Sequence, residues 1–353
     1  MNGLLTEREW RRRTETRRRQ SPAWVGAQCV TPVLSAGRRL RQDRAFRVFL
    51  LLVSLMIALS LPLMVPCKPV LSIPSMQITD AASGRVPRSV REISYQLPQR
   101  ECRVQTFPRS QLLRGKLLLL DGDHPLPGDI LPPNTFSIAA AASGMVPVSS
   151  LSIRSGKETI TALRELFAAL RAMGVEGLTV SMGTVSAAQQ HQWQRDAAAV
   201  LMQTQPVNIA VQNTLQRLDR PAQGEMLLEY AVEIRLRSAP DMPLENSRQG
   251  QALLQQAWRH GFVRTDPQSR PFRFRYVGKA HATAMTYLDV NFGEYLNWMH
   301  KKGSLAVSTE GELRYLILCQ PVTDGHASFS LPVDARCEVS LDNTGYALAA
   351  CTW

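Results

Sequence analysis

The alternation of hydrophobic and polar positions predicts one membrane-spanning helix near the start of the chain. Residues 48–65, VFLLLVSLMIALSLPLMV, carry no charge and approach the length that a helix needs to cross a bilayer. Their apolar side chains surround the whole helical circumference, and arginines stand at the edge, so a membrane helix is favoured over a buried core helix. Because no Ala-x-Ala-like cleavage site follows, an uncleaved anchor is favoured over a signal peptide.

Beyond this segment, the pattern changes repeatedly between the periods of helices and of strands. Helices are expected where apolar residues recur at helical spacing between capping residues and glycines, at 155–174, 186–203, 249–260 and 279–285. Strands are expected in short apolar or alternating runs, at 177–181, 226–236 and 272–278. Several strand-like pieces split by Gly, Pro and Asp-Asn turns fill the end of the chain and predict a small β module.

These patterns divide the chain into five parts. The segment after the membrane helix is rich in Pro, Ser and Arg and is interpreted as a stalk, and a domain of mixed helices and strands follows it. The expected parts are a basic tail (1–47), the transmembrane helix (48–65), an extracytoplasmic stalk (66–115), the main α+β domain (116–303) and the C-terminal β module (304–353).

The positive charge of the chain is concentrated in its first residues. The net charge is +12, but residues 1–47 hold twelve arginines against four acids, 12 − 4 = +8, which leaves 12 − 8 = +4 for all other residues. A nucleic-acid-binding protein is expected to carry its basic patch on the folded part, so no nucleic acid partner is predicted. By the positive-inside rule, the tail stays in the cytoplasm and the main domain is exported from a single-pass position in the cell membrane. The tail arginines are also expected to contact anionic membrane lipid.

Four of the six cysteines fall on the exported side of this topology, where oxidation is possible. Cys319, Cys337 and Cys351 share the last 35 residues, and one local disulfide among them is a hypothesis.

Two neighbouring segments, RPFRFRYVGKAHATAM (270–285) and FGEYLNWM (292–299), resemble motifs of the VanY-type zinc D-alanyl-D-alanine carboxypeptidases. Family members typically read Glu-Pro-Trp-His-Tyr-Arg-Tyr-Val-Gly, then His-Ala, and later Glu-Tyr-Leu. Three more segments agree in order: HPLPGDILPP (124–133), VSMGTVSAAQ (180–189) and GEMLLEYAVEI (224–234). The resemblance implies an α+β, VanY/Hedgehog-like core with a central, mostly antiparallel sheet. It also implies hydrolysis of a terminal D-Ala-D-Ala bond of peptidoglycan precursors by a zinc-bound water.

The same resemblance, taken residue by residue, implies that the zinc site is degenerate. The three ligand positions fall on Met226, Glu233 and Arg273, the general base on Arg270, and the carboxylate-binding arginine on Thr184. A thioether is a poor zinc ligand, and a guanidinium is a permanent cation. At about 4 Å and an effective dielectric near 20, a cation repels a divalent ion by roughly 8 kcal/mol. No zinc and no other cofactor is therefore expected.

Several functions stay open on this basis. In the first, Arg270 and Arg273, with Glu229 and Glu233 nearby, line an old cleft that binds a peptidoglycan stem peptide or an envelope protein without cutting it. In a plainer version, these residues only form salt bridges that fill the vacated site. The alternative is an active D,D-carboxypeptidase that trims stem peptides with a rebuilt site, and a third possibility is a structural role in an envelope assembly.

Overall fold

The computed structural model describes residues 75–78, 101–217, 219, 223–309 and 312–353. The expected basic tail and transmembrane helix lie outside these residues. Within the described ranges, no helix is both long and apolar enough to cross a membrane. The described residues form one compact unit.

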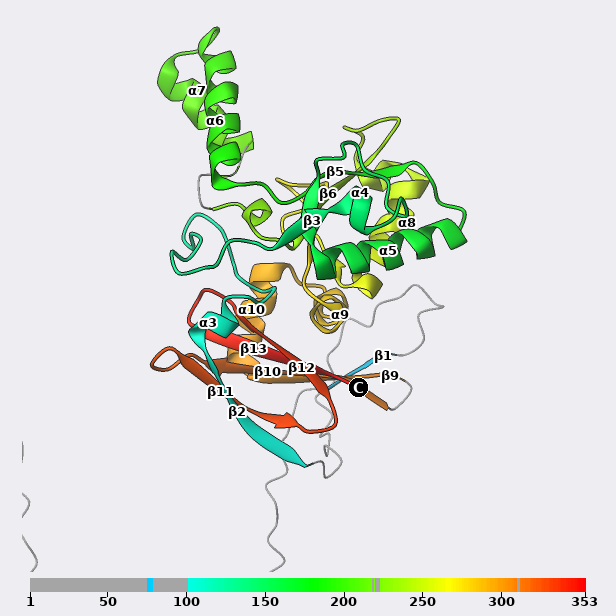
Figure 1. Cartoon of the computed structure of the whole chain (residues 1–353), viewed down its shortest axis with the longest axis vertical. Coiled ribbons are helices and arrows are strands. Elements are labelled where there is room, and N and C mark those ends of the chain that lie inside the picture. The colour runs from blue at the N-terminus through cyan, green and yellow to red at the C-terminus, as the bar shows by residue number, and fades with distance from the viewer. Residues whose placement is uncertain (1–74, 79–100, 218, 220–222, 310–311) are drawn as a thin grey trace, which may run out of the picture. The chain divides into compact units, whose positions relative to one another are not determined.

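A four-stranded antiparallel sheet organises the middle of the chain (Figure 1). Its strand order is β5 (Leu178–Met182), β6 (Ala231–Leu236), β8 (Arg273–Tyr276) and β7 (Phe262–Val263). Helices α4 (Ile138–Ala141), α5 (Lys157–Ala172) and α8 (Arg248–Ala257) share one hydrophobic core with it. A short antiparallel pair, β3 (Thr135–Ser137) and β4 (Arg154–Gly156), precedes α5. The mostly antiparallel central sheet expected from the sequence is confirmed.

A second sheet forms the C-terminal β module. Its strand order is β1 (Ser75–Ile78), β9 (Ser304–Thr309), β10 (Glu312–Pro321), β13 (Tyr346–Thr352) and β12 (Arg336–Leu341), with β1 parallel to β9 and the other pairs antiparallel. Alternate residues of β13 face opposite sides, as a strand requires. Leu348 and Ala350 pack with helices α9 (Lys279–Leu288) and α10 (Phe292–Lys302), whereas Ala347 and Ala349 pack with the next ribbon.

That ribbon joins β11 (His326–Pro332) to β2 (Cys102–Pro108), and the short helix α3 (Arg109–Leu112) follows β2. Leu112 is fully buried in the same cluster as Phe329 of β11. Residues 102–115, which belong to the stalk expected over 66–115, are therefore built into the folded unit. This segment has few hydrophobic residues, and its partner strand β11 lies far along the chain, so the sequence does not indicate the pairing.

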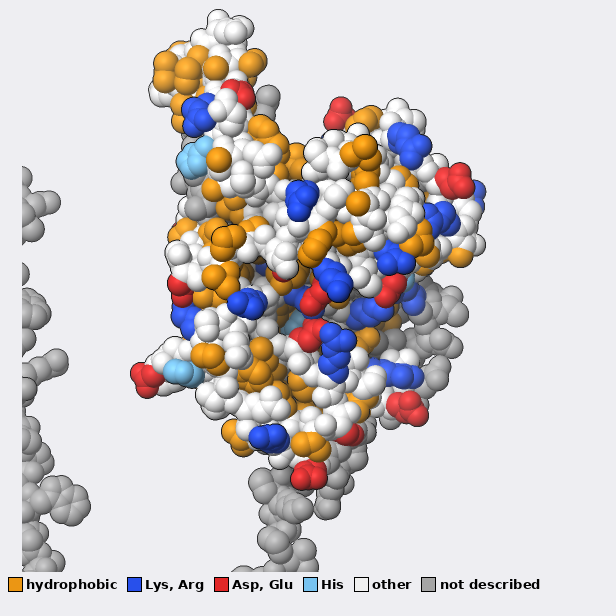
Figure 2. All heavy atoms as spheres, in the orientation of Figure 1, with side chains coloured by type: hydrophobic (Ala, Val, Ile, Leu, Met, Phe, Trp, Pro, Cys, Tyr) orange, Lys and Arg blue, Asp and Glu red, His pale blue; other side chains and the backbone are white. Residues whose placement is uncertain are grey.

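Two helices, α6 (Ala187–Met202) and α7 (Val207–Arg217), pair as a hairpin that extends away from the four-stranded sheet (Figure 1). Hydrophobic side chains gather at its far end (Figure 2), where Val200 and Val207 are each 63% exposed. The first two turns of α6 lie at the other end of the hairpin and reach the cleft described below.

Cys337 and Cys351 form a disulfide between paired positions of β12 and β13. The structure thus supplies the local bridge that was hypothesised for the end of the chain. Cys319 is a buried free thiol, and burial raises its pKa to about 12.

Candidate functional site

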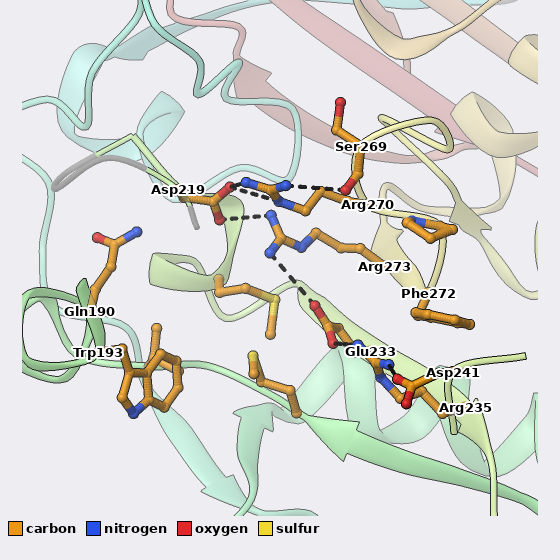
Figure 3. A pocket seen from close by; sticks show the side chains of 14 residues that line it. Gln190, Trp193, Asp219, Glu233, Arg235, Asp241, Ser269, Arg270, Phe272 and Arg273 are labelled. Carbon is orange, nitrogen blue, oxygen red and sulfur yellow. Dashed lines mark hydrogen bonds and ion pairs between the residues drawn. The ribbon is translucent and has the colours of Figure 1, made fainter. Parts of the chain in front are cut away.

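A cleft of about 550 Å³ opens beside the four-stranded sheet (Figure 3). It lies between β6, the start of β8 with the loop before it, and the first two turns of α6. Its walls are Met182, Val185, Gln190, Trp193, Asp219, Met226, Glu233, Arg235, Asp241, Ser269, Arg270, Pro271, Phe272 and Arg273. Four of the positions named from the sequence, Met226, Glu233, Arg270 and Arg273, are thereby brought together.

The carboxylate of Asp219 lies between Arg270 and Arg273, the two arginines predicted to stand at the general-base and a zinc-ligand position (Figure 3). Arg273 Nη1 is 2.7 Å from Asp219 Oδ2, and Arg270 contacts Asp219 Oδ1 through Nε at 3.1 Å and Nη2 at 3.0 Å. All three side chains are at most 16% exposed. Each contact is a charge-assisted hydrogen bond in a poorly solvated place, which strengthens it.

The ion pairs continue along the cleft. Arg273 and Glu233 are register partners on β8 and β6, with Nη2 and Oε1 3.7 Å apart. Arg235 Nη2 is 3.0 Å from Glu233 Oε2, and its Nη1 is 3.3 Å from Asp241 Oδ1. Three guanidinium groups alternate with three carboxylates, so the charged side chains of the cleft balance one another.

The opposite wall is apolar. Met226 is 2% exposed and packs with Val185, Leu227, Ala231 and Met182. Trp193 stands at the margin and is 38% exposed. The cleft therefore offers a ligand both a hydrophobic surface and a polar one.

The side chains at the family's zinc-ligand positions do not fit zinc. Of Met226, Glu233 and Arg273, only Glu233 is an ordinary zinc ligand, and its two oxygens already contact Arg273 and Arg235. None of the described residues that line the cleft is a histidine or a cysteine. Among the residues that the structure describes, no group of three His, Cys, Asp or Glu side chains is placed to hold a metal ion.

The structure places Thr184 outside the cleft. Its hydroxyl donates to the carbonyl of Leu228 at 3.2 Å, whereas the side chain of Val185 lines the cleft wall. A Cβ on Gly183 would lie 2.2 Å from the carbonyl oxygen of Arg154, so only glycine fits there. The predicted carboxylate-binding position, Thr184, therefore does not line the cleft, whereas its neighbour Val185 does.

Glu229 also lies apart from the two arginines. Its Oε2 accepts a hydrogen bond from the backbone N–H of Asn134 at 2.6 Å, and it lines a different hollow, with Tyr230. The salt bridge expected between the arginines and Glu233 is formed by Arg273, but the main partner of both arginines is Asp219, which the sequence analysis did not name.

Comparison with known proteins identifies the relatives of this chain. No protein-family model matches the sequence. A D-alanyl-D-alanine carboxypeptidase of Enterococcus faecium is 28% identical over 109 residues, which cover 28% of this chain and 35% of the enzyme. The vancomycin-resistance D,D-dipeptidase VanXYg, solved with a D-Ala-D-Ala phosphinate analogue, superposes with a TM-score of 0.58 over 71% of this chain and 99% of its own, at 15% identity. This chain is a relative of the VanY-type D,D-carboxypeptidases.

The match spans only about a third of the length of the Enterococcus enzyme. The D,D-pentapeptidase VanY of a VanB-type resistance cassette, solved with Zn(II), is 22% identical, with a TM-score of 0.43 over 52% of this chain and 99% of its own. The kinship that the motifs predicted is confirmed by the Enterococcus relative, and the α+β fold that it implied by the superposition on VanXYg.

Proposed function

We propose that this VanY relative is a membrane-anchored cell-envelope protein that binds a cell-wall peptide in its cleft without hydrolysing it. The observation that carries the proposal is the pair of ion contacts from Asp219 to Arg270 and Arg273, at positions where the family's chemistry requires a base and a metal ligand. A guanidinium held by a carboxylate neither binds zinc nor removes a proton from water.

Peptide binding is supported by the kinship and by the shape of the cleft. The Enterococcus relative is a D-alanyl-D-alanine carboxypeptidase, and VanXYg was solved with a D-Ala-D-Ala analogue. The volume of about 550 Å³ lies within the range of ligand pockets. Met182 and Trp193 offer contact surface for small apolar side chains such as those of alanine.

The membrane anchor is proposed from the sequence. Residues 48–65 carry no charge and follow the arginine-rich tail, which supports a cytoplasmic N-terminus, contact of the tail with anionic lipid, and export of the cleft to the cell-wall side. Protease added to intact cells should then digest the folded part and leave the tail intact, and digestion of the tail instead would contradict this topology.

Binding and catalysis are tested together on the full chain in detergent. We expect zinc far below one ion per chain, no release of D-alanine from N-acetyl-L-Lys-D-Ala-D-Ala, and saturable binding of a stem-type peptide by calorimetry. Stoichiometric zinc with release of D-alanine would show an active enzyme and refute the proposal.

A reversion variant tests whether the assigned positions are right. The variant Met226→His, Glu233→Asp, Arg273→His and Arg270→Glu should gain a zinc ion, because it restores three ligands and removes two cations. Its matched control carries only Arg270→Glu and should not bind zinc. If the reverted chain folds, by circular dichroism, and still binds no metal, the assignment of Met226, Glu233 and Arg273 is wrong.

A further inference from the structure

We infer that Asp219 is a specificity-determining residue of the cleft, and that it makes the cleft select peptides whose C-terminus is blocked over peptides with a free terminal carboxylate. The inference rests on the proposed peptide binding and names the chemical class of the ligand. A blocked C-terminus is one that ends in an amide or continues into a further peptide bond.

The reason lies in how the cations of the cleft are partnered. A ligand carboxylate needs a guanidinium with open donor positions, or else it is desolvated without compensation. Arg270 and Arg273 both point at the carboxylate of Asp219, and Arg273 also contacts Glu233 (Figure 3). The third guanidinium, that of Arg235, is held between Glu233 and Asp241.

Entry of a free carboxylate would therefore require exchange with Asp219. That exchange gains contacts to Arg270 and Arg273 but removes the same contacts from Asp219, whose side chain is only 16% exposed. It would also leave the cleft with four carboxylates against three guanidinium groups. Asp219 thus occupies the guanidinium donors that a terminal carboxylate would need.

A neutral peptide end meets no such competition. An amide brings no charge into a cleft whose charged side chains already balance, and it can form hydrogen bonds with their outer edges. Val185, Met182 and Trp193 supply the apolar contacts that either form of the peptide would share.

The first test compares two ligands on the unaltered full chain. The probes are N-acetyl-L-Lys-D-Ala-D-Ala as the free acid and as its C-terminal amide, each titrated by calorimetry. We expect the amide to bind more tightly than the acid. An acid that binds as tightly as the amide, or more tightly through charge-assisted hydrogen bonds to the guanidinium groups, would overturn this inference and leave the proposed peptide binding standing. Absence of binding by both would overturn the proposed function, and this inference with it.

The second test removes the negative charge of Asp219. In Asp219→Asn, the acid should gain at least about tenfold in affinity relative to the amide, because Arg270 and Arg273 lose the carboxylate that they share. The control is Asp129→Asn, which removes an Asp–Arg pair of the same kind, with Arg109 at 2.8 Å, outside the cleft. An unchanged ratio in a folded Asp219→Asn chain would contradict the inference. If this variant does not fold, the comparison of acid and amide on the unaltered chain still decides.

Discussion

The buried ion pair between Arg275 and Glu225 gives the sharpest prediction on stability. Arg275, on β8, is 0% exposed, and its Nη1 lies 2.9 Å from Glu225 Oε1. Its Nη2 donates to the carbonyls of Lys116 at 2.9 Å and Leu118 at 2.7 Å. The other oxygen of Glu225 accepts from Thr265 at 2.6 Å. This guanidinium therefore ties the four-stranded sheet to the chain segment that leads into it.

Glu225→Leu should destabilise the fold strongly. The substitution leaves the guanidinium buried with carbonyl partners only, and removal of one member of a buried pair costs about 3–5 kcal/mol. Against a typical domain stability of about 5–15 kcal/mol, this loss is large. It is measured as the change in the free energy of unfolding, from urea titrations of the detergent-solubilised chain followed by tryptophan fluorescence.

Two further variants isolate the buried charge as the cause. Glu245→Leu removes a pair with Arg264 at the same kind of distance, 2.7 Å, but the Glu245 side chain is 50% exposed, so the expected cost is about 0–1 kcal/mol. The double variant Glu225→Leu with Arg275→Met should be more stable than Glu225→Leu alone, because no unpaired charge remains. A cost below about 1 kcal/mol for Glu225→Leu, or a double variant that is less stable still, would refute the reasoning.

Three other outcomes are expected. Gly183→Ala should cost about 1–3 kcal/mol or more in unfolding free energy, because its Cβ would lie 2.2 Å from the carbonyl oxygen of Arg154. Cys351→Ser should cost about 3 kcal/mol in unfolding free energy, because it opens the loop that the Cys337–Cys351 disulfide closes, with a sequence separation of 14. Reductant should lower the unfolding free energy of the wild type to a similar value. Burial lowers the pKa of His281 to about 3. The unfolded chain therefore takes up a proton below about pH 6.5 that the folded chain refuses, and stability should fall by up to about 1.4 kcal/mol per pH unit on acidification.

Each of these has a matched control. Gly128→Ala, where a Cβ meets nothing within 4 Å, should leave stability nearly unchanged. Cys102→Ser, at an exposed free thiol, should do the same. His281→Gln should reduce the slope of stability against pH between pH 7 and 5, and an unchanged slope would mean that His281 is not its source.

Much of the fold could be predicted where local signals are complete. Helix α6 begins after Ser186 because Ser186 and Gln189 form a capping box, and both residues are visible in the sequence. The strand expected over 226–236 begins only at Ala231, since residues 225–227 form a 3-10 turn that places Glu225 against Arg275. That contact joins residues far apart in the chain, and no local pattern indicates it.

Helix α7 was not predicted, because its larger apolar residues Val207, Ile209 and Val211 alternate along the chain instead of recurring at helical spacing. Among residues 207–214, whose side chains the structure describes, Ala210 and Thr214 are buried, whereas Val207, Ile209 and Val211 are exposed. The helix is defined by its pairing with α6 rather than by a core-facing stripe, so the usual periodicity is missing.

Only the part of the candidate site that corresponds to family motifs was predicted. The motif spacing located Met226, Glu233, Arg270 and Arg273, which the fold gathers in one cleft. Asp219 belongs to no motif, and its place between two arginines depends on how the chain returns after the α6–α7 hairpin. An acidic residue that pairs with Arg270 and Arg273 could have been sought in the sequence, but the chain contains 29 Asp and Glu residues and no pattern distinguishes Asp219 among them.

The close approach of Gly183 to the carbonyl of Arg154 constrains any redesign of this scaffold. A guanidinium grafted at residue 184 would start from a backbone position that faces Leu228 and would be directed into the protein. The same graft at residue 185 would emerge through the apolar wall, directly into the binding space. Laboratory selection for a carboxylate-dependent activity should therefore enrich changes in codon 185 and leave codon 183 untouched.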